Sequence, residues 1–318
     1  MLDPNPTLTF ELEELESAAK LVYRVMPPTP LYAWPKLKRR TGCSVRVKHE
    51  NHTPTGAFKV RGGIVYLDRL CRSLPNVAGV ITATRGNHGQ SIAFAAARAG
   101  IPATIYVPAG NSPDQNSAIS GFGAKLVEFG RDFDEAKHEA FRVSGVEDLH
   151  FVPSFHRDLV AGVASYALEL FRGGGELDAV YVGVGMGSGI CGLIAVRDLL
   201  GLKTDIIGVG PVMAPATALS FAAGRAVMFP SAKTFADGLA TREPNAQAIA
   251  TICRGVARWV QVSEDEIAEG AAGAALAALL QDGQRMKNKR VVLVLSGGNI
   301  ERARYLQVLK GETPRTGD

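Results

Sequence analysis

The stretch Ala179–Leu200, AVYVGVGMGSGICGLIAVRDLL, is the part of the chain that decides the fold. Its apolar start predicts a buried strand over residues 179–184, and its end predicts a helix over 189–200. The glycines between them predict a turn in which successive backbone amides face inward. Because the following helix adds the positive end of its dipole, this turn is suited to bind a phosphate group.

Residues 187–192 also match the pattern G-x-G-x-x-G, which is typical of dinucleotide-binding sites. A dinucleotide site needs an acidic residue roughly 20 positions further along to bind the ribose hydroxyls. The sequence at the end of the next predicted strand is Val209-Gly210-Pro211-Val212, which contains no acid. We therefore expect a phosphate on a ligand of mononucleotide size, and a tight turn without a ligand is the remaining alternative.

Outward from this unit, the order of strand, loop and helix repeats along most of the chain. Further strands are predicted over residues 45–48, 77–82, 103–107, 125–129, 205–210, 256–262 and 291–295. Further helices are predicted over 9–26, 56–70, 91–98, 117–122, 132–146, 214–223 and 264–280. Apolar strands that alternate with helices indicate an α/β protein with doubly wound, mostly parallel sheets covered on both faces. Ligands of such folds bind at the carboxyl ends of the strands.

Composition and charge exclude several classes of function. With 318 residues, 46% of them hydrophobic and 21% charged, the chain has the composition of a globular protein and is long enough for two domains. The net charge is +4, and no run of Lys and Arg is interleaved with aromatic residues, so nucleic-acid binding has no support. We find no signal segment and no run of ~20 apolar residues, and therefore expect a cytoplasmic protein that does not cross a membrane.

Metal binding is not predicted either. The four cysteines lie far apart, without a Cys-x-x-Cys pair, which indicates free thiols in a reducing compartment. His49 and His52 form a His-x-x-His pair, but on an extended chain their rings should point to opposite faces.

A second stretch, Glu50–Gly63 (ENHTPTGAFKVRGG), contains the candidate catalytic residue Lys59. A predicted strand and a turn precede Lys59, so it should lie near the start of a helix that begins around Gly56. The helix dipole and the apolar ring of Phe58 should both lower the pKa of this lysine. A neutral amine is what a Schiff base with an aldehyde requires. The alternative is an ordinary surface lysine beside a turn.

Two further loops follow predicted strands. The loop Thr84–Gln90 (TRGNHGQ) contains Asn87 at a helix start, where its amide and the backbone N–H groups can bind a carboxylate or a ring hydroxyl. His88 in the same loop could act as a general base, although a hydrogen-bonding role suits its place in a turn better. The last strand ends in Leu295-Ser296-Gly297-Gly298-Asn299, which places the hydroxyl of Ser296 on a closely approachable backbone.

The lysine stretch, the Asn87 loop, the glycine loop and the terminal Ser-Gly-Gly-Asn occur in this order over nearly the full chain. Together they resemble the fold type II pyridoxal-phosphate enzymes, which have the tryptophan synthase beta-like fold. Within that superfamily, Thr-Gly-Ala-Phe-Lys-Val-Arg-Gly at residues 55–62 is similar to the branch of threonine/serine dehydratases and serine racemases. The resemblance implies pyridoxal 5'-phosphate as the cofactor, Lys59 as its Schiff-base lysine and Phe58 as a neighbour of its ring. It also implies that Asn87 bonds the ring hydroxyl and that Ser296 faces the pyridine nitrogen.

The same resemblance assigns the remaining site residues. The cofactor phosphate would be held by the backbone amides of Gly185, Met186, Gly187, Ser188 and Gly189. Gly238 matches a backbone position beside the cofactor. The substrate would lie against Thr84, Arg85, Gly86, Asn87 and His88.

The implied reaction is an α,β-elimination. It would convert a 3-hydroxy-2-amino acid of the threonine, serine, 3-hydroxyaspartate or 3-phenylserine type to a 2-keto acid and ammonia. A serine can only hydrogen-bond the pyridine nitrogen, whereas a carboxylate there would keep it protonated and strengthen the electron sink. A weaker sink favours prompt loss of a β-substituent. The alternatives are an amino-acid racemase or a β-replacement synthase of the same superfamily and, more remotely, a cofactor-binding protein without turnover.

The chain departs from the family pattern at several positions. Arg85 stands immediately before Gly-Asn-His, where serine racemases have a serine that serves as a second acid or base. Because arginine stays protonated, racemisation through this position is not expected. Arg85 could instead bind an extra substrate carboxylate, or it could face solvent or pair with a local acid. Gly210 and Ala216 stand where some relatives place carboxylates that bind a divalent cation, so no metal is expected there.

We expect two domains. Residues 1–69 and 153–318 would form a large cofactor-binding domain, and residues 70–152 would form a small domain that closes over the substrate. The family leads us to expect a homodimer that takes a small amino acid as its substrate. No regulatory domain is expected after Ser296, because the chain ends soon afterwards.

Overall fold

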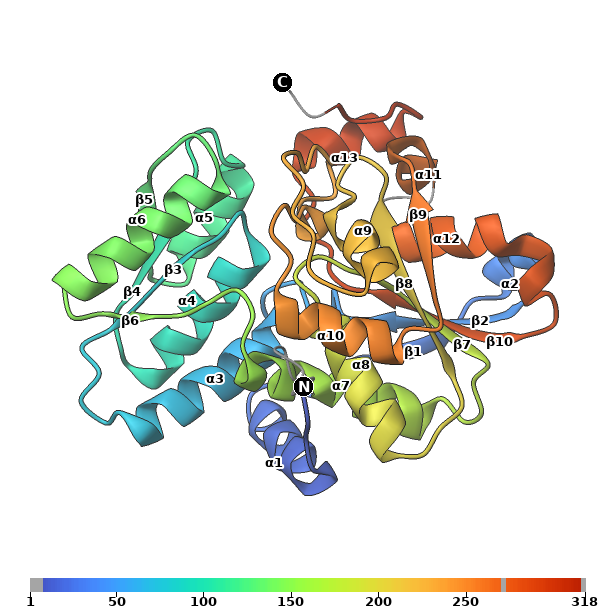
Figure 1. Ribbon diagram of the computed structural model, residues 1–318, viewed down its shortest axis with the longest axis horizontal. Coiled ribbons are helices and arrows are strands. Elements are labelled where there is room, and N and C mark those ends of the chain that lie inside the picture. The colour runs from blue at the N-terminus through green and yellow to red at the C-terminus, as the bar shows by residue number, and fades with distance from the viewer. Residues whose placement is uncertain (1–7, 270–272, 316–318) are drawn as a thin grey trace.

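The structure is a computed structural model, and it describes residues 8–269 and 273–315. Two separate sheets organise this part of the chain (Figure 1). The larger sheet has six strands in the order β1-β2-β10-β7-β8-β9, and the smaller has four in the order β5-β4-β3-β6. The small sheet and its helices lie on the left of Figure 1, and the large sheet lies on the right.

Most neighbouring strands are parallel. The strands of the large sheet are β1 (Leu31–Ala33), β2 (Ser44–His49), β7 (Ala179–Gly183), β8 (Asp205–Pro211), β9 (Arg258–Val262) and β10 (Arg290–Leu295). Those of the small sheet are β3 (Val80–Ala83), β4 (Ala103–Val107), β5 (Lys125–Glu128) and β6 (His150–Phe151). Only the pairing of β1 with β2, at the edge of the large sheet, is antiparallel among these strands. The predicted α/β class with mostly parallel sheets is therefore confirmed.

Helices connect the parallel strands. The small sheet carries α4 (Asn87–Ala99), α5 (Pro113–Gly121) and α6 (Phe133–Val146). The other helices are α1 (Leu12–Tyr23), α2 (Pro35–Thr41), α3 (Lys59–Ser73), α7 (Arg157–Gly173), α8 (Ser188–Leu199), α9 (Ala216–Ala223), α10 (Ala246–Gly255), α11 (Glu264–Glu269), α12 (Ala274–Asp282) and α13 (Arg302–Leu309). Two 3-10 turns are η1 (Asp237–Leu239) and η2 (Gly283–Met286).

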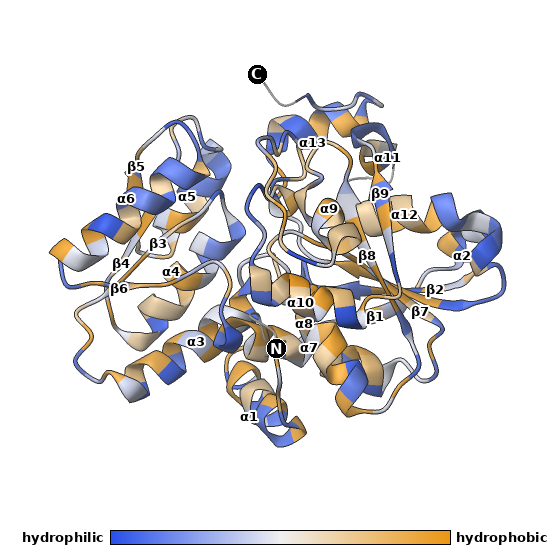
Figure 2. Cartoon of the chain, in the orientation of Figure 1, coloured by the Kyte–Doolittle hydropathy of each residue, from blue (hydrophilic) through white to orange (hydrophobic). Residues whose placement is uncertain are grey.

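Strand β7 contributes side chains to two separate hydrophobic cores, one on each face of the sheet. Val180 and Val182 belong to the cluster that also contains the apolar faces of α7, α8 and α10, whereas Ala179 and Tyr181 belong to the cluster that contains α12. This alternation follows from the two-residue period of a strand. Because both faces of the strand are buried, its sequence is almost continuously apolar, as the central strands in Figure 2 show.

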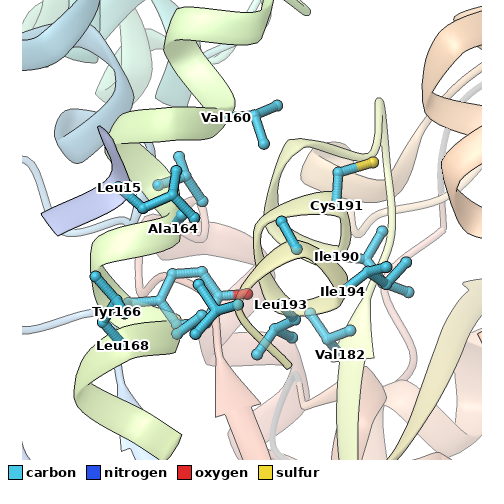
Figure 3. Packing of buried hydrophobic residues seen from close by; sticks show 14 of the residues in the cluster. Leu15, Val160, Ala164, Tyr166, Leu168, Val182, Ile190, Cys191, Leu193 and Ile194 are labelled. Carbon is cyan, nitrogen blue, oxygen red and sulfur yellow. The ribbon is translucent and has the colours of Figure 1, made fainter. Parts of the chain in front are cut away.

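Helix α7 lies against α3 and α8 and is buried along most of its length. No helix was predicted for these residues. Figure 3 shows Tyr166 of α7 reaching toward Leu193 of α8 within the shared core. Two glycines let α7 cross α3 closely. A Cβ on Gly162 would lie 2.2 Å from the carbonyl oxygen of Arg61, and one on Gly62 would meet the backbone of α7 at 2.8 Å.

Several other elements differ from the sequence predictions. The helix predicted over 91–98 begins earlier, at Asn87, because Gly86 ends the loop and the residues after it join the first helical turn. The single helix predicted over 264–280 is two helices, α11 and α12, and residues 270–272 lie outside the described residues. Elements β1, α2, β6, α10 and α13 were not predicted. Within the described ranges, every helix is too short or too polar to cross a bilayer.

Candidate active site

Lys59 is the first residue of α3 and lies at the carboxyl end of the large sheet. The residue before it is attached to the end of β10, because the N–H of Phe58 donates to the carbonyl of Ser296 at 3.0 Å. The Nζ atom of Lys59 lies 3.4 Å from Oγ of Ser188, the first residue of α8. The structure therefore brings together the lysine stretch, the glycine loop and the last strand end, which are far apart in the sequence.

The amine of Lys59 is poorly solvated. Burial lowers the pKa of Lys59 to about 8. Its Nζ lies 5.7 Å from the centroid of the Phe58 ring, which supplies part of the apolar surroundings. Burial is the cause of this lowering, and a contribution of the helix dipole stays a prediction. A substantial fraction of the amine is thus neutral near pH 8, as a nucleophile requires.

The glycine loop between β7 and α8 forms a cradle for an anion. Gly187 has a φ of +99° and caps the start of α8, which is 12 residues long. A Cβ on Gly185 would lie 2.2 Å from the carbonyl oxygen of Gly238, so only glycine fits there. Within the described residues, the backbone N–H groups of residues 185–189 have no protein acceptor. Free amides at the start of a helix fit a phosphate group.

Phe58 and Tyr166 support the start of α8. The hydroxyl of Tyr166 donates to the carbonyl of Gly189 at 2.8 Å, and its ring lies 6.1 Å from the Phe58 ring, centroid to centroid. A Cβ on Gly189 would already lie 3.4 Å from the Phe58 ring. Phe58 therefore lies close to both Lys59 and the start of α8, and its place beside a cofactor ring stays a prediction.

Asn87 is joined to the large sheet through Asn299. The Nδ2 atom of Asn299 donates to Oδ1 of Asn87 at 2.8 Å and to the carbonyl of Thr55 at 2.6 Å. The carbonyl of Asn299 accepts a hydrogen bond from Nε2 of Gln115 at 2.5 Å. Nothing in the sequence around Gln115 signals this contact, and Asn299 is recognisable only as the residue that closes the Ser-Gly-Gly-Asn stretch.

Helix α4, which begins at Asn87, also contacts Lys59 itself. The hydroxyl of Ser91 donates to the carbonyl of Lys59 at 2.6 Å. A Cβ on Gly63 would lie 2.3 Å from this hydroxyl, so the two helices approach closely. Ser91 is a second residue of the site that the sequence pattern does not reveal, because its partner lies in a different helix.

Thr84 and Gly86 shape the loop before α4. The hydroxyl oxygen of buried Thr84 accepts from the backbone N–H of Gly86 at 2.9 Å and of Gly89 at 3.1 Å. A Cβ on Gly86 would lie 2.4 Å from Oε1 of Gln115. The side chain of Thr84 is thus engaged in hydrogen bonds inside the loop.

His88 has a buried hydrogen-bonding position. Its Nε2 lies 3.2 Å from the hydroxyl of Thr82. Burial, together with the nearby charge of Lys59, lowers the pKa of His88 to about 3. An imidazole with so low a pKa is a weak base, so this geometry favours the hydrogen-bonding role over general-base catalysis.

Arg85 is the exposed residue of the loop and makes no hydrogen bond or ion pair within the described residues. Its charge acts on Asp237, whose carboxylate lies 3.1 Å from Nη1 of Arg304. Burial raises the pKa of Asp237, and the charges of Arg304 and Arg85 oppose that rise. Gly238 follows Asp237 and approaches Gly185, so the carboxylate on which Arg85 acts lies in the turn beside the glycine loop.

The prediction for the two histidines of the lysine stretch was wrong in its geometry. The rings of His49 and His52 lie 5.3 Å apart, centroid to centroid, rather than on opposite faces, because β2 ends at His49 and the chain turns. The Nε2 atom of His49 accepts from the indole N–H of Trp34 at 3.2 Å. No group of three potential metal ligands occurs within the described ranges.

Comparison with known proteins agrees with this arrangement. Residues 22–297 match the family model described as pyridoxal-phosphate dependent enzyme. The L-threonine ammonia-lyase of Geobacter sulfurreducens is 34% identical over 277 residues, which cover 82% of this chain and 69% of that protein. A serine racemase of Schizosaccharomyces pombe is 29% identical, with 93% of this chain and 96% of the relative covered. The L-threo-3-hydroxyaspartate ammonia-lyase of Saccharomyces cerevisiae is 28% identical, with 93% and 95% covered.

A solved structure has the same fold. The processed form of threonine deaminase isoform 2 from Solanum lycopersicum superposes with a TM-score of 0.86 at 28% identity, covering 98% of this chain and 97% of that one. A lysine beside a cradle for an anion, at the strand ends of an α/β protein, is a suitable place for a phosphate-bearing cofactor. The chain belongs to the pyridoxal-phosphate dependent enzymes, in the fold type II branch of threonine dehydratases and serine racemases.

Proposed function

We propose that this protein is an ammonia-lyase that uses pyridoxal 5'-phosphate to convert a 3-hydroxy-2-amino acid to a 2-keto acid and ammonia. The observation that carries the proposal is the amine of half-buried Lys59, 3.4 Å from the hydroxyl of Ser188 at the start of α8. One small molecule with an aldehyde and a phosphate could therefore reach both the amine and the free amides of residues 185–189.

Each residue would have a separate task. Lys59 would hold the cofactor through its aldehyde carbon and, once the substrate amine has replaced it, would take the proton from the substrate α-carbon. The amides of residues 185–189 would hold the phosphate, Asn87 would bond the ring hydroxyl, and Ser296 would bond the pyridine nitrogen. The bound cofactor supplies the electron sink for the carbanion.

Elimination is favoured over racemisation because neither Arg85 nor His88 is suited to be a second base. Racemisation needs a second group that exchanges a proton on the other face of the substrate. Arg85 stays protonated and cannot accept a proton, and His88 is a weak base that is bonded to Thr82. With Ser296 as the partner of its pyridine nitrogen, the cofactor would be a weaker electron sink, which would favour elimination of a β-substituent.

The test is to supply the holoenzyme with threonine, serine, 3-hydroxyaspartate and 3-phenylserine and to measure three quantities: ammonia, 2-keto acid and the chirality of the remaining amino acid. We expect ammonia and keto acid in equal amounts with at least one substrate, and none with Lys59→Ala. Inversion of the amino acid without ammonia would identify a racemase instead. No product and no spectral change with any substrate would indicate a binding protein without turnover.

We further propose that Arg85 binds a second carboxylate of the substrate, as in 3-hydroxyaspartate. The exposed guanidinium is unpaired within the described residues, and it lies close enough to Asp237 for their charges to interact. The relative from Saccharomyces cerevisiae named as a 3-hydroxyaspartate ammonia-lyase is consistent with a diacid. Arg85→Ser should reduce kcat/KM for 3-hydroxyaspartate by about 10-fold or more and leave serine nearly unchanged. An equal change for both substrates would contradict this role.

Three expectations from the sequence remain proposals. We propose that residues 70–152 form a domain that closes over the substrate, that the protein is a homodimer, and that it acts in the cytoplasm. The small sheet, β3 to β6, falls within the proposed small domain, and the four cysteines are free thiols, as a reducing compartment favours. Light scattering of the purified protein tests the dimer directly.

A further inference from the structure

Behind the first turn of α3 lies a buried charge cluster made of Lys48, Glu50, Arg61 and Glu169. The side chains of Arg61 and Glu50 have no exposed surface, and those of Lys48 and Glu169 are 1% and 6% exposed. Two positive and two negative groups are present, so the charges balance. Arg61 follows Lys59 by two residues, which on a helix puts their side chains on nearly opposite faces. No step of the proposed reaction uses this cluster.

The guanidinium of Arg61 uses all its N–H donors. Its Nε donates to Glu50 at 2.7 Å, and its Nη1 donates to Glu169 at 2.6 Å and to the hydroxyl of Ser165 at 2.9 Å. Its Nη2 donates to the second oxygens of Glu50 and Glu169 at 3.0 Å and 3.1 Å. Two-point contacts with both carboxylates fix the plane of the guanidinium as well as its position.

The carboxylates are anchored to the strand ends of the large sheet. The backbone N–H of Glu50 donates to the carbonyl of Leu295, the last residue of β10, at 2.9 Å. Glu169 of α7 accepts from Nζ of Lys48 in β2 at 2.5 Å. The first turn of α3 is therefore connected to α7 and, through Glu169 and Lys48, to β2 by buried charged hydrogen bonds, and to β10 through the backbone of Glu50.

Such a cluster is a poor source of stability, because removing charges from water costs about as much as their attraction returns. Apolar side chains of similar volume often stabilise a core equally well or better. What the charges do provide is a defined geometry. Reacting groups need that geometry, since a misplacement of ~1 Å can reduce a rate ~100-fold.

We propose that Arg61 is a positioning residue for Lys59, which fixes the first turn of α3 so that the amine stays beside the glycine loop. The opposite side of this turn is held by Ser91, whose hydroxyl donates to the carbonyl of Lys59 at 2.6 Å. The inference rests on the proposed role of Lys59 and is independent of which amino acid is the substrate.

The test compares Arg61→Met with Arg69→Met. Arg69 is a matched control because it lies on the same helix, is 28% exposed and pairs with Glu14 and Asp158. For each holoenzyme we would measure kcat and KM, and for each apo protein the pH midpoint of covalent capture of pyridoxal 5'-phosphate and the urea unfolding curve. These readouts separate the position of the amine from the stability of the fold.

Arg61→Met should reduce kcat by about 10- to 100-fold while KM changes by less than about threefold. The pH midpoint of cofactor capture should rise from about 8 toward that of an ordinary lysine, because a loosened amine is better solvated. Arg69→Met should keep the kcat and the midpoint of the native protein. If Arg61→Met keeps the native kcat and the native pH midpoint of cofactor capture, the proposal is overturned, whatever the unfolding curve of the variant shows.

If Arg61→Met does not fold, Ser165→Ala replaces it, since it removes one hydrogen bond to Arg61 and leaves every charge in place. A smaller change of the same two quantities is expected, and no change would again overturn the positioning role. Capture of the cofactor needs no substrate. Failure of every amino acid to react would therefore count against the ammonia-lyase, while the midpoints would still decide the role of Arg61.

Discussion

At the scale of single residues, the pKa of Lys59 sets the conditions under which the site can react. The protonated amine is not a nucleophile, and burial lowers the pKa of Lys59 to about 8. Lys59, Asn87 and Ser296 are candidates from the sequence alone, because each stands in a short local motif. Asn299, Ser91 and Gln115 could not, because their contacts depend on segments that meet only in the folded chain.

The lowered pKa predicts a pH dependence. The rate at which the apo protein captures pyridoxal 5'-phosphate should rise with pH, show a midpoint near 8 and level off above it, because the neutral fraction of the amine is then complete. Stopped-flow absorbance measures this rate, with Lys59→Ala as the control for other lysines. A rate that continues to rise past pH 10 would mean that the amine is solvated like an ordinary lysine.

At the scale of elements, close contacts through glycine decide how the site is assembled. Most strands and several helices were predicted from their periodicity, whereas the short, exposed helix α13 was not. Helix α7 was not predicted, because residues 159–168 are buried without a break, and an apolar run alone does not distinguish a helix from a strand. Its crossing with α3 depends on Gly162, where a Cβ would lie 2.2 Å from the carbonyl oxygen of Arg61.

Gly162→Ala should therefore lower the free energy of unfolding by about 1–3 kcal/mol, the usual cost of overpacking a tight contact. The matched control is Gly145→Ala in α6, where a Cβ meets nothing within 4 Å. That substitution should stabilise the protein by about 0.5–1 kcal/mol, because alanine is the better helix former. Urea unfolding measures both, and equal effects would show that the crossing tolerates a side chain.

Gly185→Ala should act on the cofactor. A Cβ there would lie 2.2 Å from the carbonyl oxygen of Gly238, so the loop must shift, and its amides would move away from the proposed phosphate position. Loss of one charged hydrogen bond, about 1.5–3 kcal/mol, raises the dissociation constant of pyridoxal 5'-phosphate about 10-fold or more. Absorbance titration of the apo protein gives this constant. If the variant binds the cofactor as tightly as the native protein does, the glycine loop does not bind the cofactor phosphate.

At the scale of the whole molecule, the site exists because two sheets meet. Asn87 comes from the small sheet, Ser188 and Ser296 come from strand ends of the large sheet, and Lys59 begins the helix that leaves the large sheet. The two parallel sheets could be predicted from apolar strands that alternate with helices. Their mutual placement could not, because it depends on the buried contacts of α3 with α4 and α7.

The central claim is that one molecule bridges the amine of Lys59 and the amides of the glycine loop. The direct measurement is to reduce the apo protein with borohydride in the presence of pyridoxal 5'-phosphate or of pyridoxal, which lacks the phosphate, and to map the labelled peptide by mass spectrometry. Pyridoxal 5'-phosphate should label Lys59 alone, and pyridoxal should label it far less. A label on a different lysine, or equal labelling by the two aldehydes, would contradict the claim.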